Sequence, residues 1–579
     1  MAFNLSSDPR ALEGMIAVSR FFSLNLFLLT GVLLLIGLPV AVVVGHLFMP
    51  GGESWSYLSE TVLPRYVLNS LILVLTVGFG TFLIGTGAAW LVTIYEFPGR
   101  RFFEWAMILP LAAPAYVLAY AYTDFLQVSG PVQSLLRDLT GLGPRDYWFP
   151  QIRSLGGAIT VFILALYPYV YLAGRAAFLQ QSECVVEASR TLGCTPWAAF
   201  HRVALPLARP ALAAGVALAL METLADFGAV SYFGVQSFTT GIYRAWFSFG
   251  DRVVAAQLAS LLLGFVVLLL FLEKTSRRGA RYYQTSQKMR SLNIQRLTGL
   301  RGWLAAFLCA LPFFAGFLLP VLILLHLAYA GGDAQFGHRY LDLAKKSISL
   351  ALITALLAVM LALLISYARR TDSTPLSRTT SAIAGIGYAI PGSIIAVGVL
   401  IPFAWLDNRV DAFFRNTFDQ STGLLLTGSI AALIFAYLVR FLALAQQTTW
   451  AGLLKITPSM DAAAASLGVG RFEALRRVHM PLLKAPLLTA GLLVFVEVMK
   501  ELPATLIMRP FNFDTLAVQA HNLAADERLA EAATPALTIV LVGLLPVIIL
   551  TRLISRSRPG HAPMPRKQLL NAPPPSLIR

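Results

Sequence analysis

The chain has 579 residues, of which 57% are hydrophobic and only 13% are charged, and its formal net charge is +16. Soluble domains have about a quarter of their residues charged, so this composition excludes an ordinary soluble protein and indicates a protein of the lipid bilayer. The positive charge does not predict nucleic-acid binding, because Lys and Arg lie mostly between alternate apolar runs and form no basic patch with interleaved aromatic residues.

Apolar runs of about 20 residues recur from Phe21 to Ile554, and each is long enough to cross a hydrocarbon core of about 30 Å as a helix. We predict about twelve transmembrane helices and an all-α, polytopic membrane fold. The approximate spans are 23–48, 68–94, 103–126, 157–178, 208–231, 253–273, 302–329, 347–368, 382–406, 423–445, 484–508 and 534–554.

Proline and glycine interrupt two of these spans, Pro110 and Pro114 the third and Pro391 and Gly392 the ninth. Such breaks free backbone groups that lipid cannot satisfy, so we expect both helices to be packed inside protein. The excess of Lys and Arg between alternate spans predicts that the N- and C-termini are cytoplasmic. The first apolar run extends for about 25 residues without a small-residue cleavage site, so we interpret it as a retained helix and not a signal peptide.

The sequence contains one unit twice. When Glu187 is placed on Ala462, the two long stretches that start at these residues superimpose without gaps. The identical pairs include Ala188 and Ala463, Leu192 and Leu467, Gly193 and Gly468, Arg202 and Arg477, Val203 and Val478, Pro206 and Pro481, and Glu222 and Glu497. We predict a tandem 6+6 parallel repeat, with a first half at 1–275, a basic cytoplasmic linker at 276–300, a second half at 301–558 and a cytoplasmic tail at 559–579.

Each half has a loop whose residues predict a bent pair of short helices. An Ala-rich segment favours a helix, a glycine permits a left-handed turn, and a proline starts the next segment. These loops are residues 179–209 and 446–483. They resemble the cytoplasmic signature of the permeases of binding-protein-dependent ABC importers of the type I fold. The first copy has Glu187-Ala188 with Gly193 and Pro206, and the second has Asp461-Ala462-Ala463 with Gly468 and Pro481 but lacks the leading Glu.

The resemblance implies that both loops dock on separate ATP-binding subunits, with Glu187 ion-paired there. One copy of this chain would then bind two ATPase subunits, and a periplasmic binding protein would deliver the substrate in the bacterial inner membrane. The chain contains no G-x-x-x-x-G-K-[ST] phosphate-binding loop, so ATP and Mg²⁺ are expected on the partners and no cofactor on this chain. We therefore predict a transport permease and not an enzyme.

Four carboxylates lie inside the predicted fifth and eleventh spans, namely Glu222 with Asp226 and Glu497 with Glu501. Charge within a membrane is costly and is usually functional, and the spacing of four residues would place each pair along one helix face. We expect the pairs to face one another along a translocation path, without a permanent metal site. Lys500, Arg244 or Arg509 could instead pair with them structurally. Further oxygen atoms could come from Tyr116, Tyr120, Tyr122 and Asp124, which an interfacial aromatic belt would also explain.

These stretches resemble the ferric iron permeases of the family most, and oxygen ligands suit a hard cation. Thiamine, phosphonate, sulfate or polyamine permeases of the same class are alternatives. From another class, a proton-driven secondary transporter would use the carboxylates as a proton relay, although such a carrier has no need of the repeated loops. A membrane enzyme has no support, since the seven His and three Cys residues show no ligand or catalytic spacing.

Overall fold

The computed structural model describes residues 29–180, 191–277, 295–331, 337–371 and 374–556. We refer to residues 29–277 as the first half and to residues 295–556 as the second half. The described chain is almost entirely helical, which confirms the predicted all-α polytopic fold. Two strands of two residues each, β1 (Tyr95–Glu96) and β2 (Gln295–Arg296), pair in parallel.

The elements of the first half follow in chain order. They are the helix Leu29–His46, α2 (Glu53–Thr61), α3 (Leu63–Ile94), α4 (Arg100–Ala106), η1 (Leu109–Ala112), α5 (Ala115–Leu126), α6 (Pro131–Thr140), α7 (Leu155–Gln180), α9 (Pro196–Ala199), η2 (Phe200–Ala204), α10 (Leu205–Ala225), α11 (Gly228–Tyr232), α12 (Phe238–Tyr243), η3 (Arg244–Ser248) and α13 (Arg252–Arg277).

The second half has a similar series of elements. They are α14 (Leu300–Phe313), η4 (Phe314–Leu318), α15 (Leu319–Gly331), α16 (His338–Thr371), α17 (Pro375–Ala384), η6 (Gly387–Ala389), α18 (Gly392–Phe418), α19 (Ile430–Leu453), α20 (Pro458–Ser466), α21 (Arg471–Ala474), η7 (Leu475–His479), α22 (Met480–Lys500), α23 (Pro503–Met508), α24 (Leu516–Ala525) and α25 (Leu529–Arg556).

The internal repeat of the sequence is also a repeat of structure. Helices α10 and α22 begin and end at positions that the sequence repeat makes equivalent, and α7 and α19 begin at equivalent positions. In the first half α3, α7 and α10 pack against one another, and in the second half α16, α19 and α22 do the same. The boundaries of the predicted halves remain predictions, because most of the linker and the whole tail lie outside the described residues.

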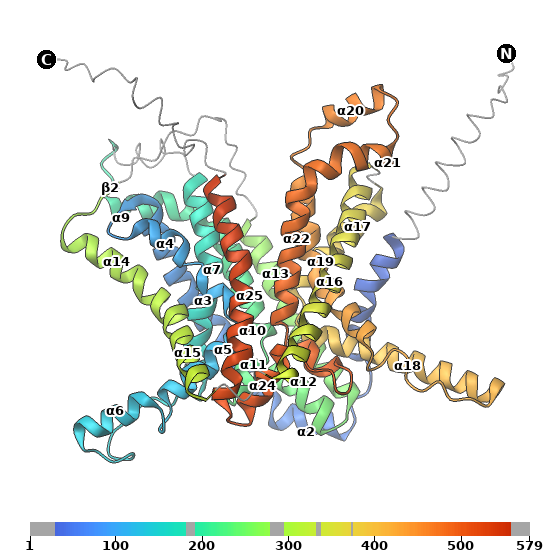
Figure 1. The fold of residues 1–579 in the computed structure, drawn as a ribbon, viewed down its shortest axis with the longest axis horizontal. Coiled ribbons are helices and arrows are strands. Elements are labelled where there is room, and N and C mark those ends of the chain that lie inside the picture. The colour runs from blue at the N-terminus through green and yellow to red at the C-terminus, as the bar shows by residue number, and fades with distance from the viewer. Residues whose placement is uncertain (1–28, 181–190, 278–294, 332–336, 372–373, 557–579) are drawn as a thin grey trace.

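The two halves exchange their first helices. Helix α14 and the turn η4 contact α3, α4 and α7 of the first half. Helix Leu29–His46 lies against α18, so closely that a Cβ at Gly398 would be 2.4 Å from the carbonyl oxygen of Pro39. Figure 1 shows this exchange, with the blue first helix on the right beside α18 and α14 on the left beside α4. The halves therefore form one interlocked bundle.

Eleven helices of the described chain are long and apolar enough to cross a membrane, or up to twelve if one bent pair is a single span. The bent pair is the predicted third span, in which Arg100–Ala112 and Ala115–Thr140 meet at 93°. The break falls at Pro114, which has an extended backbone, and the residues that follow in α5 are mostly buried. The predicted burial of this broken helix is therefore confirmed.

Several predicted spans differ from the helices by more than a turn, among them the tenth, which was predicted at 423–445 and is α19 at Ile430–Leu453. For three spans the cause is visible. The ninth, predicted at 382–406, is helix α18 and begins only at Gly392, because Pro391 before it is extended and has no N–H to donate. The fifth and eleventh, predicted to run to 231 and 508, end at Ala225 and Lys500 where the backbone turns extended. These two helix ends position the candidate site.

Candidate functional site

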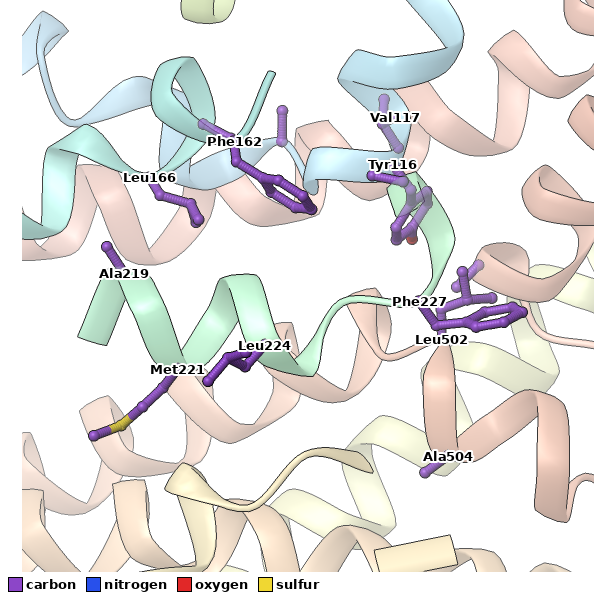
Figure 2. Close-up of a cluster of buried hydrophobic side chains, with 14 of the residues drawn as sticks. Tyr116, Val117, Phe162, Leu166, Ala219, Met221, Leu224, Phe227, Leu502 and Ala504 are labelled. Atoms are coloured by element: carbon purple, nitrogen blue, oxygen red, sulfur yellow. The ribbon is translucent and has the colours of Figure 1, made fainter. Parts of the chain in front are cut away.

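The ends of α10 and α22 face an internal cavity of about 110 Å³ between the two halves. Its apolar wall includes Tyr116, Phe162, Leu166 and Leu502, and Figure 2 shows these side chains around the point where the α10 ribbon gives way to the chain that leads to Phe227. Six charged side chains complete the lining, namely Glu222, Asp226, Glu497, Glu501, Arg440 and Lys500. The structure thus brings together all four carboxylates that the sequence selected.

Asp226 and Glu501 lie at the ends of the helices and not within them. Each follows the last residue of a long helix, with ψ angles of 136° and 124°, so the chain becomes extended after it. The backbone N–H of Asp226 still donates to the carbonyl oxygen of Glu222 at 3.0 Å, as in a helix. Both members of each pair line the cavity, and their alignment along one helix face stays a prediction.

Asp226 and Glu501 hold the start of the next short helix. Asp226 Oδ1 accepts hydrogen bonds from the backbone N–H groups of Ala229, at 2.8 Å, and Val230, at 3.2 Å. Glu501 accepts the equivalent bonds from Ala504, at 2.9 Å, and Thr505, at 3.0 Å. A carboxylate at a helix N-terminus satisfies donors that otherwise have no partner, so these two charges are fixed by backbone.

The second half supplies both cations of the cavity. Arg440 Nη1 of α19 lies 3.3 Å from Glu501 Oε1, and both side chains are more than 90% buried. Lys500 Nζ lies 2.8 Å from Glu497 Oε1. Of the three structural partners considered from the sequence, only Lys500 is confirmed. Arg509 pairs with Asp514 instead, and the described residues contain no ion pair between Arg244 and these carboxylates.

Only one of the four additional oxygen candidates borders the cavity. Tyr116 lines it and donates to the carbonyl oxygen of Lys500 at 3.4 Å. Tyr120 is hydrogen-bonded to His521 at 2.9 Å, and Tyr122 donates to the carbonyl oxygen of Ala315. Asp124 does not line the cavity. No three His, Cys, Asp or Glu side chains of the described chain lie close enough together to hold a metal ion.

Sequence reasoning missed Arg440 and Tyr169, which both line the cavity. Arg440 could have been found, because it is a single charge inside the predicted tenth span and intramembrane charge is itself a functional signal. Tyr169 offered no such signal, since tyrosine is common in membrane helices. A third residue, Tyr388, lies within electrostatic range of Glu222.

The predicted bent loops lie at the N-terminal ends of α10 and α22, away from the cavity at the C-terminal ends of these helices. In the second half α20 is followed by Gly468, whose φ of +74° is left-handed, and then by α21. Gly193 has the same conformation, with a φ of +88°. Figure 1 shows α20 standing apart from the bundle at the top of the view, above α22. Glu187 and Ala188 lie outside the described residues.

From the glycine onward each loop runs directly into a cavity-lining helix. α21, the π-helical turn η7 and α22 follow one another without a gap, and Pro481 is the second residue of α22. In the first half α9, η2 and α10 follow in the same way, with Pro206 second in α10. Residues Arg471–Lys500 therefore form a rod of 30 residues, about 45 Å long, from the loop to the cavity.

Asp461 is bound inside its own chain. One carboxylate oxygen accepts from Arg370 Nη2 at 2.6 Å and Nε at 3.0 Å, and the other contacts His479 Nε2 at 2.6 Å. Burial acts to raise the pKa of Asp461, but the hydrogen bonds from Arg370 and His479 outweigh it and hold the pKa below its ordinary value. Ala462 and Ala463, in contrast, are exposed on α20.

The loops also expose large apolar side chains at matching positions. Leu192 and Leu467 are 85% and 81% exposed, and Trp197 and Phe472 are each 71% exposed. The members of each pair are equivalent in the register of the repeat and lie close to the left-handed glycines. Paired apolar exposure of this size on a polar loop is typical of a surface that binds another protein.

Comparison with known proteins gives a family match and several relatives. Residues 81–278 match the family described as binding-protein-dependent transport system inner membrane component. The Fe(3+)-transport system permease protein FbpB 2 of Haemophilus influenzae is 26% identical over 536 residues, which cover 91% of this chain and 98% of that protein. The ferric transport system permease protein FbpB of Actinobacillus pleuropneumoniae is 25% identical over 489 residues, 80% of this chain and 67% of that protein. The sulfate transport system permease protein CysT of Escherichia coli is 29% identical over 261 residues, 43% of this chain and 90% of that protein.

Proposed function

We propose that this chain is a membrane permease of the binding-protein-dependent transport family and that it imports ferric iron as the membrane subunit of an ATP-driven transporter. Three of the relatives that align with more than three quarters of its length are named as ferric or Fe(3+) transport permeases. The sulfate permease aligns with less than half of the chain. The assignment of the substrate depends further on whether the chemistry of the cavity suits it.

The observation that carries the iron proposal is the convergence of four carboxylates on one cavity between the halves. Carboxylate oxygens are hard ligands that suit a small, highly charged cation. With all six charged groups ionised, four negative and two positive charges leave a net charge of −2, which repels sulfate, phosphonate and other anions. The carboxylates are separate enough to pass a cation along without trapping it.

The two loops are the proposed docking sites for two ATP-binding subunits, which hold ATP and Mg²⁺ and perform the hydrolysis. The left-handed glycines Gly193 and Gly468 and the exposed apolar side chains beside them support this assignment. The substrate-binding protein then docks on the opposite face. The loops lie in the cytoplasm, as do both termini, and the chain itself binds no cofactor.

Transport proceeds by alternating access. Closure of the ATPase subunits draws the two loops together, and each loop moves the rod that follows it. Because Glu497 lies near the far end of the rod Arg471–Lys500, with Glu501 just beyond it, a tilt of that rod displaces the carboxylates and opens the cavity to one side. Hydrolysis of ATP resets the starting state.

Reconstitution with the partners tests this proposal. The chain is placed in proteoliposomes with its ATP-binding subunits inside and the iron-loaded binding protein outside, and uptake of radioactive iron is measured with and without ATP. We expect ATP-dependent uptake of ferric iron and none of sulfate. Uptake that persists without the ATPase and follows a proton gradient would establish a secondary transporter, and ATP-dependent uptake of another substrate alone would overturn the iron assignment.

A further inference from the structure

Arg440 lies at the centre of the cation path. It belongs to α19 of the second half, is 7% exposed as a residue, and lines the cavity with the four carboxylates. Besides its contact with Glu501, it lies within electrostatic range of Glu222 and Glu497. Its positive charge therefore acts on carboxylates of both halves at once.

The guanidinium is confined on one side by backbone. A Cβ at Gly392, the first residue of α18, would lie 2.5 Å from Glu501 Oε1 and 2.7 Å from Arg440 Nη1. Only glycine leaves room for the ion pair at this contact. The start of α18 therefore blocks movement of the Arg440 side chain to that side, and the cavity lies open to it.

The guanidinium is also incompletely satisfied. Arg440 Nε is buried and has no hydrogen-bond partner among the described residues. Buried donors are almost always paired in native structures, and an unpaired one raises the free energy of the state that contains it. The position of Arg440 against Glu501 is thus less stable than a fully bonded ion pair and can rearrange more readily.

The helix ends do not need this cation in order to fold. In the register of the repeat, the first half has Ala165 in place of Arg440 and Ala225 in place of Lys500, and both alanines line the same cavity. Asp226 nevertheless caps α11 as Glu501 caps α23. If the cations only stabilised the helix ends, both halves would need them. Because only the second half has them, we infer that they have a role other than stabilising the helix ends.

We propose that Arg440 is a built-in counter-ion that occupies the cation path in this conformation, and that the cargo cation must displace its guanidinium from the carboxylates in order to pass. This inference rests on the proposed transport of a cation. In the absence of cargo, Arg440 neutralises carboxylates that would otherwise repel one another across the cavity. When the cargo enters, the guanidinium moves away, and its return expels the cation by competing for the same oxygens. Arg440 thereby limits how tightly the cavity holds a multivalent cation.

Binding of Tb³⁺ to the purified full-length chain tests the proposal. Tb³⁺ is a trivalent cation that prefers oxygen ligands, and Tyr116 and Tyr169 in the cavity wall can sensitise its luminescence. We expect Arg440→Gln to bind Tb³⁺ at least tenfold more tightly than the wild type, through sites that disappear when Glu222 and Glu497 are also replaced by Gln. Arg415→Gln is the matched control, because Arg415 is paired with Asp411 outside the cavity, and should stay within twofold of the wild type.

Arg440→Gln leaves Glu501 buried without its cation and could prevent folding. The double variant Arg440→Gln with Glu501→Gln avoids this, and it should bind Tb³⁺ at least threefold more tightly than the wild type, because the competing guanidinium is gone from Glu222 and Glu497. Unchanged or weaker binding in whichever variant folds overturns the counter-ion role. If the wild type neither imports iron nor binds Tb³⁺ through Glu222 and Glu497, the proposed function itself fails. If it does both and the variants gain no affinity, only this inference fails.

Discussion

Asp226 and Glu501 hold the same structural position in the two halves. Each is the first residue after a long cavity-lining helix, and each accepts two backbone hydrogen bonds from the first turn of the next short helix. Only Glu501 has a buried arginine beside it. Both halves therefore have a carboxylate that caps the next short helix, but the two cations of the cavity come from the second half alone.

Substitution of Glu222 and Glu497 changes the charge of the cavity without removing the carboxylates that cap α11 and α23. Neither is a helix-capping residue, so Gln at both positions should keep the fold and remove two of four negative charges. We expect iron uptake by the double variant to fall at least tenfold with normal amounts of inserted protein. The reason is that the negative charge of the cavity carboxylates, which attracts the cation, is halved.

The control for this pair is Asp342→Asn, which neutralises a carboxylate of an exposed ion pair with Lys346 on α16. It should transport normally. Wild-type iron uptake by the Glu222 and Glu497 double variant would show that these carboxylates only hold helices together.

The two left-handed glycines should be intolerant of β-branched residues. Among the described residues, a Cβ at Gly193 or Gly468 would meet no atom within 4 Å, so the space around these glycines is not the constraint there. The constraint is the positive φ, which β-branched residues adopt only with strain. Gly193→Val or Gly468→Val should abolish ATP-dependent transport while the chain still inserts into the membrane.

Gly470 provides the matched control in the same loop. It also has open space around its Cβ position, but its φ is −68°. Gly470→Val should therefore transport within about twofold of the wild type. Normal uptake by the Gly193 and Gly468 variants would refute the docking role of both loops.

The contacts of Asp461 predict an effect on coupling. In the first half the equivalent positions of Asp461, Arg370 and His479 are Val186, Tyr95 and Ala204, so this ion-pair network belongs to the second loop alone. It ties α20 to α16 and to the turn that leads into α22. Asp461→Asn should weaken that tie and lower the number of iron ions moved per ATP hydrolysed, while ATP hydrolysis continues.

Asp461→Glu, which keeps the charge, should restore part of the coupling. A proportional fall in both transport and hydrolysis would instead indicate that Asp461 contacts the ATP-binding subunit directly, as the family resemblance implies. The two results thus distinguish a role of Asp461 within this chain from a direct contact with the ATP-binding subunit.

The sequence was sufficient for those features that depend on periodicity and local chemistry. Apolar runs of sufficient length predicted the helical membrane fold, and the left-handed geometry of Gly193 and Gly468 followed from glycine in an Ala-rich loop. The helix ends at Ala225 and Lys500 were missed, although Gly228 and Pro503 follow them at equivalent positions of the repeat and favour a helix end. The carboxylates of Asp226 and Glu501 accept from N–H groups three and four residues further along the chain, which is a local turn that needs no distant contact.

The cavity depended on contacts between residues that are distant in the sequence. The sequence selected its four carboxylates from their cost in a membrane, and the structure brings all four to one cavity. Arg440 is distant from them in sequence and reaches Glu501 through the packing of α19 against α22 and α23. No local sequence pattern predicts the contact between Arg440 and Glu501.

The last prediction concerns acid sensitivity and His521. This side chain lies on α24, is 9% exposed, and is hydrogen-bonded to Tyr120. Burial lowers the pKa of His521 to about 4, below its ordinary value of 6.5. Above pH 6.5 the ring is neutral in both the folded and the unfolded chain, so it contributes no pH dependence. As the pH falls from 6.5 toward 4 only the unfolded chain takes up the proton, and the folded state loses up to about 3 kcal/mol of stability.

Thermal unfolding of the detergent-solubilised protein between pH 7.5 and pH 4 checks this prediction. We expect the midpoint of the wild type to fall with acidity below about pH 6.5, and we expect part of that slope to disappear in His521→Gln, which keeps a polar group near Tyr120 but does not titrate. His46→Gln controls for the loss of one histidine, at a ring that is hydrogen-bonded to the carbonyl oxygen of Val42 in its own helix. An identical slope in wild type and His521→Gln would mean that the buried ring accepts its proton without opening the fold, which the apolar surroundings of α24 oppose.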